Sequence, residues 1–225
     1  MAEMGIFKNY NFAIMVHLNS NQTIIRPKFV VMDAFDVSFT GKPSHAAASP
    51  WDGINALDAL QLTFHAIDLL RQQCEPSARI SYFIKEGGSA SNIITDHTIC
   101  QIEFRHENTK KLNDLKGKII NCVKGAAIAT GNIYEIKETG YQYKNLLPNE
   151  YGENIIKETL KELEMSYTTD IVPTGSSDIG NVSNECPAFH PLLKTSEDYF
   201  SLHTKEMVNV VKSKYIDEII YHKNK

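Results

Sequence analysis

The sequence predicts an α/β protein in which a ferredoxin-like domain, residues 33–146, interrupts a partial α/β domain made of residues 1–32 and 147–225. In the central segment, runs with period-two alternation and two amphipathic stretches follow one another as strand, helix, strand, strand, helix, strand. Residues 1–32 hold too little apolar sequence to fold alone, and residues 147–225 could form one layer of an α/β domain. We therefore expect the flanks to combine into one interrupted domain, with the central segment forming a four-stranded sheet covered by two helices.

The first strand of the central segment is predicted from Asp33 to Thr40, where apolar and polar residues alternate. Gly41 and Pro43 end it. A helix is then expected to begin at Pro50, because Ser49 is a favourable N-cap and proline suits the first helical position. Its apolar stripe recurs at three- and four-residue spacing to about Leu70.

The remaining elements follow from the same two periods. In the central segment we expect two strands, a helix and a closing strand at residues 80–84, 98–105, 112–131 and 133–137. In the flanks we expect a single apolar strand, a helix, a second strand and a terminal helix, the first three at residues 12–16, 149–163 and 167–172.

Composition excludes several classes of protein. A net charge of -4 without a basic cluster argues against a nucleic-acid partner. The apolar runs are far shorter than the ~20 residues that span a bilayer, and the N-terminus lacks a signal-peptide pattern, so we expect a cytoplasmic protein without membrane contact. The four cysteines are scattered without C-x-x-C spacing, which favours buried free thiols over disulfides or a thiolate metal site.

His45 is the first candidate for chemistry. It lies in the small-residue turn Ser44-His45-Ala46-Ala47-Ala48, between the first predicted strand and helix, with no bulky neighbour to cover the imidazole. An exposed, positioned histidine can donate a hydrogen bond to a developing oxyanion or move a proton near neutral pH. The residues alone favour an ordinary surface histidine over a catalytic one.

Two other segments are candidates. His17 ends the apolar run of the first flank, at the sheet edge where ligands of α/β folds gather, although a structural histidine fits there too. The loop Gly175–Gly180 lacks the lysine of a P-loop and the G-x-S-x-G spacing of a nucleophile elbow. Asp178 in this loop is predicted to contact substrate, or else the loop is a plain turn.

The stretch GKPSHAAASPWDGINALDAL resembles the lid motif of the zinc-dependent amidohydrolase and exopeptidase family of aminoacylases, carboxypeptidase G and aminobenzoyl-glutamate hydrolases, most closely the last branch and its dipeptidases. The resemblance implies a homodimer formed through the lid. It also implies that His45 crosses the dimer interface and polarises the scissile carbonyl in the partner's active site, acting on a small amide or dipeptide substrate.

The same resemblance implies roles elsewhere. The segment leading to His17, and SLHT with His203, resemble metal-binding stretches of the family, so both histidines are implied ligands of zinc or another divalent metal. Asn92 resembles the lid asparagine that touches substrate, and PTGSSDIGNVSNECPAFHPLLKT resembles the signature in which Asp178 lines the site. Arg105 could pair with a substrate carboxylate, because its guanidinium matches that geometry. Asn92 and Arg105 could also be an ordinary turn residue and a solvated strand charge.

The family's His-x-Asp or Cys-x-His and Glu-Glu motifs do not occur in this sequence. Two histidines alone bind zinc poorly, and without the second glutamate the water lacks a general base. We therefore expect an incomplete member of the family, lacking the N-terminal part of the catalytic domain and inactive as this chain alone. The alternatives are a non-catalytic dimerisation module, or a site completed by a separate polypeptide. Apolar faces left exposed on residues 147–225 predict poor solubility.

Overall fold

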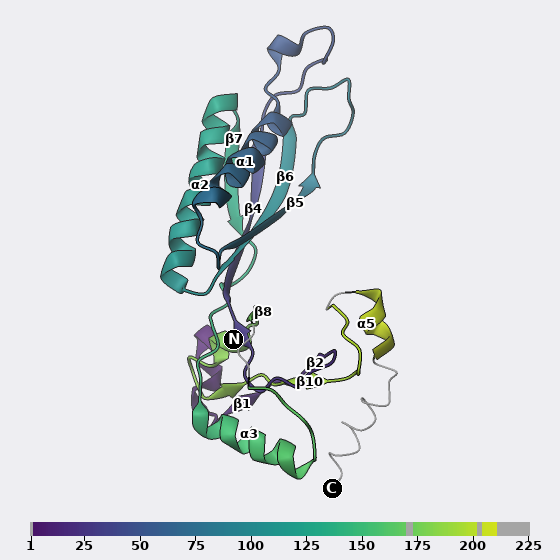
Figure 1. The fold of residues 1–225 in the computed structure, drawn as a ribbon. Coiled ribbons are helices and arrows are strands. Elements are labelled where there is room, and N and C mark those ends of the chain that lie inside the picture. Colours follow the sequence, from purple (N-terminus) through teal and green to yellow (C-terminus); the bar gives the residue numbers. More distant parts are fainter. Residues whose placement is uncertain (1, 170–172, 202–203, 211–225) are drawn as a thin grey trace. The chain divides into compact units, whose positions relative to one another are not determined.

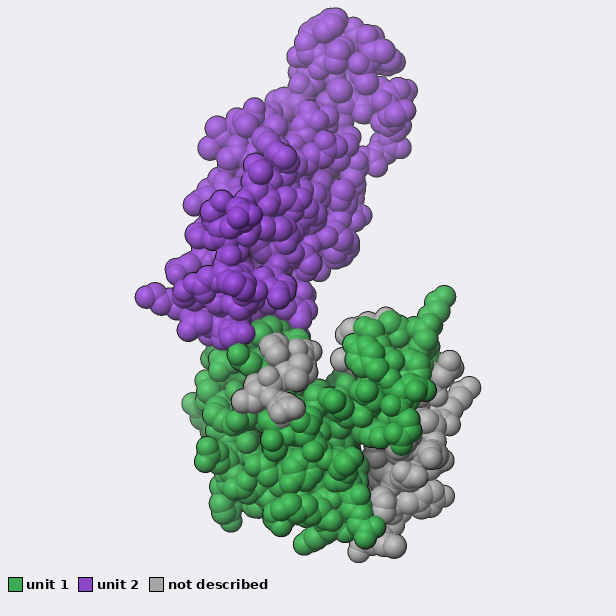
Figure 2. All heavy atoms as spheres, in the orientation of Figure 1, with its two compact units in different colours: residues 1–30, 144–225 green, residues 31–143 purple. Residues whose placement is uncertain are grey.

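The computed structural model describes residues 2–169, 173–201 and 204–210. The chain divides into two compact units (Figure 2). Unit 1 consists of residues 1–30 and 144–225, and unit 2 of residues 31–143. Within the described residues no helix is long and apolar enough to cross a membrane.

Unit 2 is an antiparallel four-stranded sheet with two helices on one face (Figure 1). Its elements follow the predicted order and confirm the ferredoxin-like topology, with the strands arranged as β5-β6-β4-β7. In chain order they are β4 (Val31–Thr40), α1 (Ala56–Leu70), β5 (Arg79–Glu86), β6 (His97–His106), α2 (Thr109–Thr130) and β7 (Ile133–Glu138).

The core of unit 2 lies between the sheet and the helices. Every second residue of β4 and β6 is buried, as the alternating pattern predicted. Phe35 and Phe104 meet across the two strands with ring centroids 5.5 Å apart. The fully buried side chains that join them come from both strands and both helices: Val37, Phe39, Leu60, Ile67, Ile102, Leu112, Ile119 and Val123.

The start of α1 corrects the sequence-based prediction. Residues Pro50–Asp52 form only a 3₁₀ turn, Ser49 makes no side-chain cap, and Gly53 is extended. The α-helix begins at Ala56, where the side chain of Asn55 accepts the N–H of Leu57. The local signals at residues 49–52 are overridden because the next residues pair with the chain that leaves β4.

A buried charge ties α2 to the sheet. Asp33, 4% exposed, accepts a hydrogen bond from the Lys116 ammonium at 2.9 Å, and Glu138 on β7 accepts another at 2.7 Å. These two carboxylates raise the pKa of Lys116 against the lowering effect of burial, which is the largest single influence. The helix is therefore held by a charge shared between two strands as well as by its apolar stripe.

Unit 1 is built from short parallel pairs. β1 (Ala13–Ile14) pairs with β9 (Ala188–Phe189), β2 (His17–Asn19) with β10 (Leu192–Lys194), and β3 (Lys28–Phe29) with β8 (Pro173–Gly175). The single apolar strand expected at residues 12–16 is shorter in the structure: Ala13–Ile14 form β1, Met15 still donates its N–H to the Phe189 carbonyl at 3.0 Å, and β2 begins at His17 as a separate pair with β10. Of the strand expected at 167–172, Thr168 makes one bridge to Ile24, and residues 170–172 lie outside the described part.

The described part of unit 1 also has two 3₁₀ helices, Ala2–Met4 and Ile6–Asn9, and three α-helices: α3 (Glu150–Glu162), α4 (Ile179–Val182) and α5 (Lys205–Val210). α3 begins where predicted, because the Asn149 side chain accepts the N–H of Gly152. The helix lies flat on Phe189, since a Cβ at Gly152 would come within 2.0 Å of that ring. The small apolar core on these strands consists of Ile24, Phe29, Ile179, Ala188 and Leu192.

Candidate functional site

The loop that carries His45 closes on itself at its base. Lys42 and Ile54 exchange two backbone hydrogen bonds of 2.9 Å, and a Cβ at Gly41 would lie 2.0 Å from the Ile54 carbonyl oxygen. Only glycine fits this close approach of two backbones. The loop between β4 and α1 therefore projects from a fixed base, at one end of the sheet.

A second segment braces the same loop. Ala46 donates its N–H to the Asn92 carbonyl at 2.9 Å, and Ile94 donates to the Ser44 carbonyl at the same distance. This short antiparallel ladder brings two of the predicted site residues, His45 and Asn92, to one end of unit 2. The Asn92 side chain is exposed and has no hydrogen bond within the described residues, so it is available to an incoming group.

The imidazole of His45 is exposed but held. Its Nδ1 accepts the backbone N–H groups of Ala47 at 3.2 Å and Ala48 at 3.1 Å. The carbonyl of His45 accepts the N–H of Ser49 at 3.0 Å. The ring thus closes its own turn, in the way that a helix-capping side chain does.

His17 lies in unit 1, at the start of β2. Its Nδ1 hydrogen-bonds the Leu18 carbonyl oxygen at 2.6 Å, and its ring stacks on His190 with centroids 5.8 Å apart. His190 is 2% exposed, meets the edge of Phe29, and its Nδ1 is buried without a partner in the described structure. Burial, and then the neighbouring His17, lower the pKa of His190 to about 4. His190 is therefore neutral near pH 7.

Of three further predicted residues, Arg105 lies in unit 2, Asp178 lies in unit 1, and one lies outside the described residues. Arg105 lies near the far end of β6, about 27 Å along eight residues of extended strand from the end that adjoins the His45 loop, and both its Nε and Nη2 donate to Glu103 at 2.9 and 2.8 Å. Asp178 is exposed before α4 and makes no side-chain cap. Its carboxylate partly offsets the lowering of the His190 pKa. His203 falls outside the described residues.

Sequence reasoning missed His190. It follows Ala188-Phe189 at the end of a short apolar strand, as His17 follows its own apolar run. That matching position was the available signal. β10 begins two residues after His190 and pairs with β2 through Leu192 and His17. This parallel pairing brings the rings of His17 and His190 together.

The described residues do not form a metal centre by themselves. Among them, no group of three His, Cys, Asp or Glu side chains is placed to hold a metal ion. His17 fits one position of a site, since an exposed imidazole is a good ligand for zinc. The set present in the described part therefore does not fit a divalent metal without further ligands.

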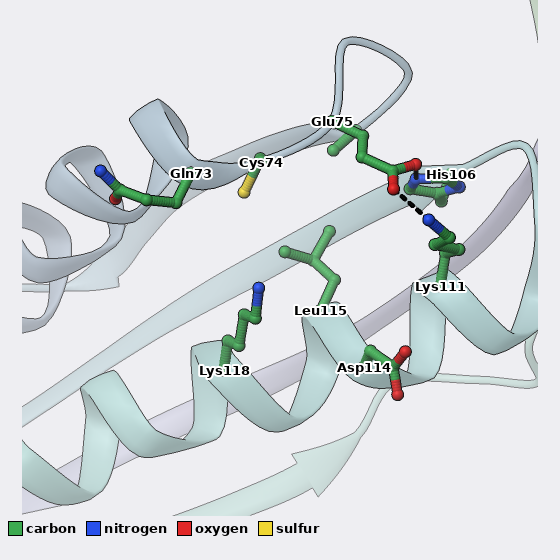
Figure 3. A pocket seen from close by; sticks show the side chains of 9 residues that line it. Gln73, Cys74, Glu75, His106, Lys111, Asp114, Leu115 and Lys118 are labelled. Atoms are coloured by element: carbon green, nitrogen blue, oxygen red, sulfur yellow. Dashed lines mark hydrogen bonds and ion pairs between the residues drawn. The ribbon is translucent and has the colours of Figure 1, made fainter.

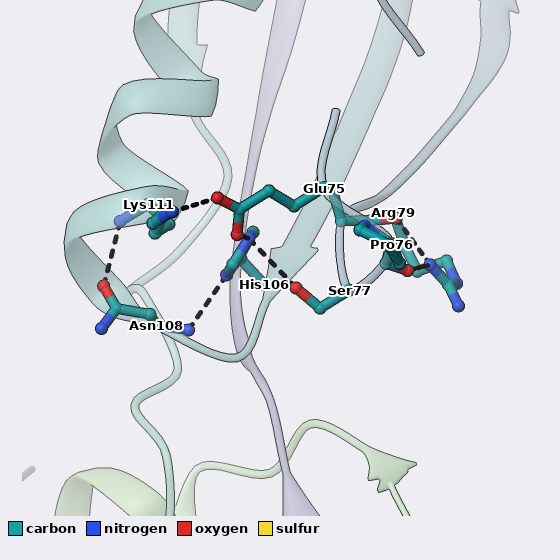
Figure 4. A network of polar contacts seen from close by, with 8 residues as sticks. Glu75, Pro76, Ser77, Arg79, His106, Asn108 and Lys111 are labelled. Carbon is teal, nitrogen blue, oxygen red and sulfur yellow. Dashed lines mark hydrogen bonds and ion pairs between the residues drawn. The ribbon is translucent and has the colours of Figure 1, made fainter. Parts of the chain in front are cut away.

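A serine and a histidine also meet on unit 2, beside a pocket of about 240 Å³ between the end of α1 and α2 (Figure 3). Ser77 Oγ lies 3.1 Å from His106 Nε2 (Figure 4). The His106 Nδ1, however, accepts the backbone N–H of Asn108 at 3.1 Å. The hydrogen of the neutral ring is therefore on Nε2, which donates and cannot take a proton from serine.

The same network is structural. Glu75 lies 3.4 Å from His106 Nε2 and also pairs with Lys111. The Lys111 ammonium holds the pKa of the Glu75 carboxyl below its ordinary value. The contacts fasten the segment after α1 to the first turn of α2, which explains the cluster without a catalytic role.

Comparison with known proteins agrees with this architecture. Residues 32–130 match the family model described as a peptidase dimerisation domain. The chain is 35% identical to the Xaa-Arg dipeptidase of Mus musculus over 92% of its own length and 48% of that protein. It is 27% identical to a p-aminobenzoyl-glutamate hydrolase homolog of Haemophilus influenzae, over 62% of this chain and 34% of the relative.

Among solved structures, the aminobenzoyl-glutamate utilization protein from Klebsiella pneumoniae superposes with a TM-score of 0.71 at 20% identity, covering 96% of this chain and 56% of that one. This likeness supports the fold. The chain spans about half the length of the curated dipeptidases it matches. Residues 32–130 are therefore similar to a peptidase dimerisation domain, and the chain is similar to dipeptidases and aminobenzoyl-glutamate hydrolases over part of their length.

Proposed function

We propose that this chain supplies the dimerisation lid and part of the catalytic domain of a metal-dependent hydrolase of amide bonds. Its substrates are small: dipeptides, N-acyl amino acids or aminobenzoyl-glutamate-like compounds. The working form is a homodimer in which unit 2 of one copy presents His45 to the site of the other. The relatives' names support this substrate class, and the matched dimerisation domain supports the assembly.

The state of His17 is the observation that carries the proposal. A carbonyl oxygen only accepts, so the 2.6 Å contact with Leu18 requires a hydrogen on His17 Nδ1. The neutral ring then has its lone pair on Nε2. This is the arrangement of a metal-binding histidine, whose other nitrogen donates to a carbonyl or carboxylate that fixes its orientation.

His17 alone does not make the site, and the metal requires ligands beyond the described residues. Zinc or another divalent ion, once bound, would polarise the scissile carbonyl and activate water. The chain's own part is to offer one imidazole ligand from β2 and one donor from the His45 turn. Asn92 on the lid, and Asp178 in unit 1, are the proposed substrate contacts.

An apolar groove on unit 1 supports the proposal that the chain holds only part of the catalytic domain. A groove of about 590 Å³ runs between α3 and β1, lined almost entirely by apolar side chains. Phe12, Ile14 and Val16 on this side are each at least half exposed. β1 is paired on one edge only within the described chain, and parallel strands are normally buried on both sides. We expect further polypeptide of the catalytic domain to cover this groove.

A second function is favoured by the complete core of unit 2. A domain that packs its own sheet and helices can pair two copies without any reaction, and the histidines of unit 1 would then be vestigial. The two proposals make different demands on metal. A dimerisation module needs none, whereas a hydrolase needs a full ligand set.

The test begins with the chain alone, by sedimentation equilibrium, elemental analysis for bound metal, and assays on an Xaa-Arg dipeptide and on p-aminobenzoyl-glutamate. We expect a dimer without stoichiometric zinc or turnover. A polypeptide corresponding to the part of the relatives outside the match is then added. Restored hydrolysis that disappears in His17→Gln, and that falls at least about 10²-fold in His45→Ala, supports the hydrolase.

The matched control is His65→Ala, because His65 is an exposed histidine on α1. It should keep full activity. A dimer that remains inactive after complementation would favour the dimerisation module. Turnover that survives His17→Gln would contradict the assigned ligand.

A further inference from the structure

The two hydrogen bonds on His45 decide which form of the ring the turn accepts. A backbone N–H donates its hydrogen and has nothing to accept with, so Nδ1 must offer its lone pair to Ala47 and Ala48. In the neutral ring the hydrogen is then on Nε2. The opposite tautomer would point an N–H at two other N–H groups and lose both contacts.

The rest of the turn keeps these amides in place. The Ala46 N–H is bound to the Asn92 carbonyl, and the Ser49 N–H to the carbonyl of His45 itself. The amides of Ala47 and Ala48 are the two between them, and their side chains are too small to compete. Within the described residues Nε2 has no hydrogen-bond partner, and the ring is exposed.

We infer that the backbone amides of Ala47 and Ala48 are positioning groups that lock His45 in the Nε2–H tautomer, so that it acts as a hydrogen-bond donor and not as a general base. This inference rests on the proposed function for what the donor meets: the oxygen of a substrate amide carbonyl, where negative charge develops. A base would need its lone pair free at the outer nitrogen, and here that lone pair is turned inward.

His17 shows the converse arrangement within the same chain. Its Nδ1 faces an acceptor, the Leu18 carbonyl, and the lone pair is turned outward on Nε2. The backbone contacts at Nδ1 thus leave Nε2 in opposite states: a lone pair that can bind a metal at His17, and an N–H that can donate a hydrogen bond at His45.

The test reads the tautomers directly. Long-range ¹H–¹⁵N correlation spectra of the ¹⁵N-labelled full chain, at about pH 8 where ordinary imidazoles are neutral, distinguish a protonated from an unprotonated ring nitrogen. At His45 we expect the Nε2–H form to exceed the other by at least about tenfold, because the other form loses two hydrogen bonds. His65 is exposed, and within the described residues its ring accepts no backbone N–H, so it is the internal control and should show a mixture.

Two substitutions complete the test. Ala48→Pro removes one of the two N–H groups and should reduce the bias at His45, whereas Ala48→Gly keeps the N–H and should preserve it. A mixture at His45 equal to that of His65 would overturn the inference. So would an unchanged bias in Ala48→Pro. If the proline distorts the turn, the comparison of His45 with His65 in the unaltered chain still decides.

The measurement is independent of catalysis. A mixture of the two tautomers at His45 would contradict the inferred tautomer preference. It would not contradict the proposed hydrolase, since His45 could still donate in one of its forms. A single Nε2–H tautomer at His45, in a chain that hydrolyses no amide after complementation, would contradict the proposed function. The tautomer preference would then be a property of the turn alone.

Discussion

Unit 2 and unit 1 bury apolar side chains to very different extents. In unit 2 the central residues of β4, β6, α1 and α2 are fully buried and form one continuous cluster. Among the described residues of unit 1, the buried cluster has five members, each 3–7% exposed, beside an apolar groove. The difference indicates that unit 2 carries its own stability, whereas unit 1 depends on contacts beyond the described residues.

The largest expected difference between the two units is in the unfolding free energy lost when a phenylalanine is replaced by alanine. Phe104→Ala in unit 2 should lower the free energy of unfolding by about 3–5 kcal/mol, because it leaves a cavity against Phe35. Phe12→Ala in unit 1 should change it by less than about 0.5 kcal/mol, since that ring is 60% exposed. Denaturant unfolding followed by amide hydrogen exchange measures both. A large cost at Phe12 would mean that the groove is covered in solution.

Cysteine alkylation gives the next largest contrast. Cys100 is fully buried in unit 2, and burial raises the pKa of its thiol to about 12. Only the thiolate reacts, so Cys100 should label when unit 2 opens. Cys186, 7% exposed in unit 1, should label about tenfold faster if unit 1 opens more readily. Peptide mass spectrometry gives both rates, with half-buried Cys74 as the reference. Equal rates would mean that the units unfold together.

Removing a helix cap should lower the free energy of unfolding by the same amount in both units. Equal losses would show that the difference between the units comes from core packing and not from their helices. Asn55→Ala on α1 and Asn149→Ala on α3 each remove an acceptor for one backbone N–H, and each should lower the free energy of unfolding by about 1 kcal/mol. Ser49→Ala is the control and should have no effect, because the Ser49 side chain caps nothing. Thermal melts of the three variants measure this. A loss at Ser49 would restore the helix start predicted from the sequence.

The smallest effect concerns a surface ion pair of unit 2. Lys85 Nζ lies 2.7 Å from Asp36 Oδ1, with both side chains partly exposed. Lys85→Gln should lower the free energy of unfolding by about 0.2–1 kcal/mol at low salt and by less in about 1 M salt, where charges are screened. Lys42, exposed and without an ion pair in the described structure, is the control. A salt-independent loss would indicate a packing role for the Lys85 stem.

The elements of unit 2 were predictable because long periods identify them. β6 alternates over ten residues and α2 carries its stripe over 22, so their predicted positions in the sequence were close to the structure. The start of α1 was wrong because local capping signals at Ser49 and Pro50 compete with a tertiary contact, the pairing of Lys42 with Ile54, that sequence patterns do not contain.

Unit 1 was less predictable for a different reason. Strands of two or three residues, such as β1 and β9, show no period. The same holds for its chemistry. His17 could be proposed from its position, but His190 becomes noticeable only when the parallel pairing places the two rings together. In unit 2, His45 and Asn92 were named from the sequence, and the ladder that joins them was not.

The backbone pairing between the start and the end of unit 2 has a consequence for the order of folding. Met32 and Tyr143 exchange backbone hydrogen bonds of 3.1 and 2.8 Å, so the chain enters and leaves unit 2 at neighbouring points. Unit 1 must join two segments separated by about 110 residues, and closing such a loop in a disordered chain costs about 4 kcal/mol. Once unit 2 has folded, the packing of its core has already compensated for the entropy cost of closing this loop. The two halves of unit 1 then leave unit 2 at neighbouring points.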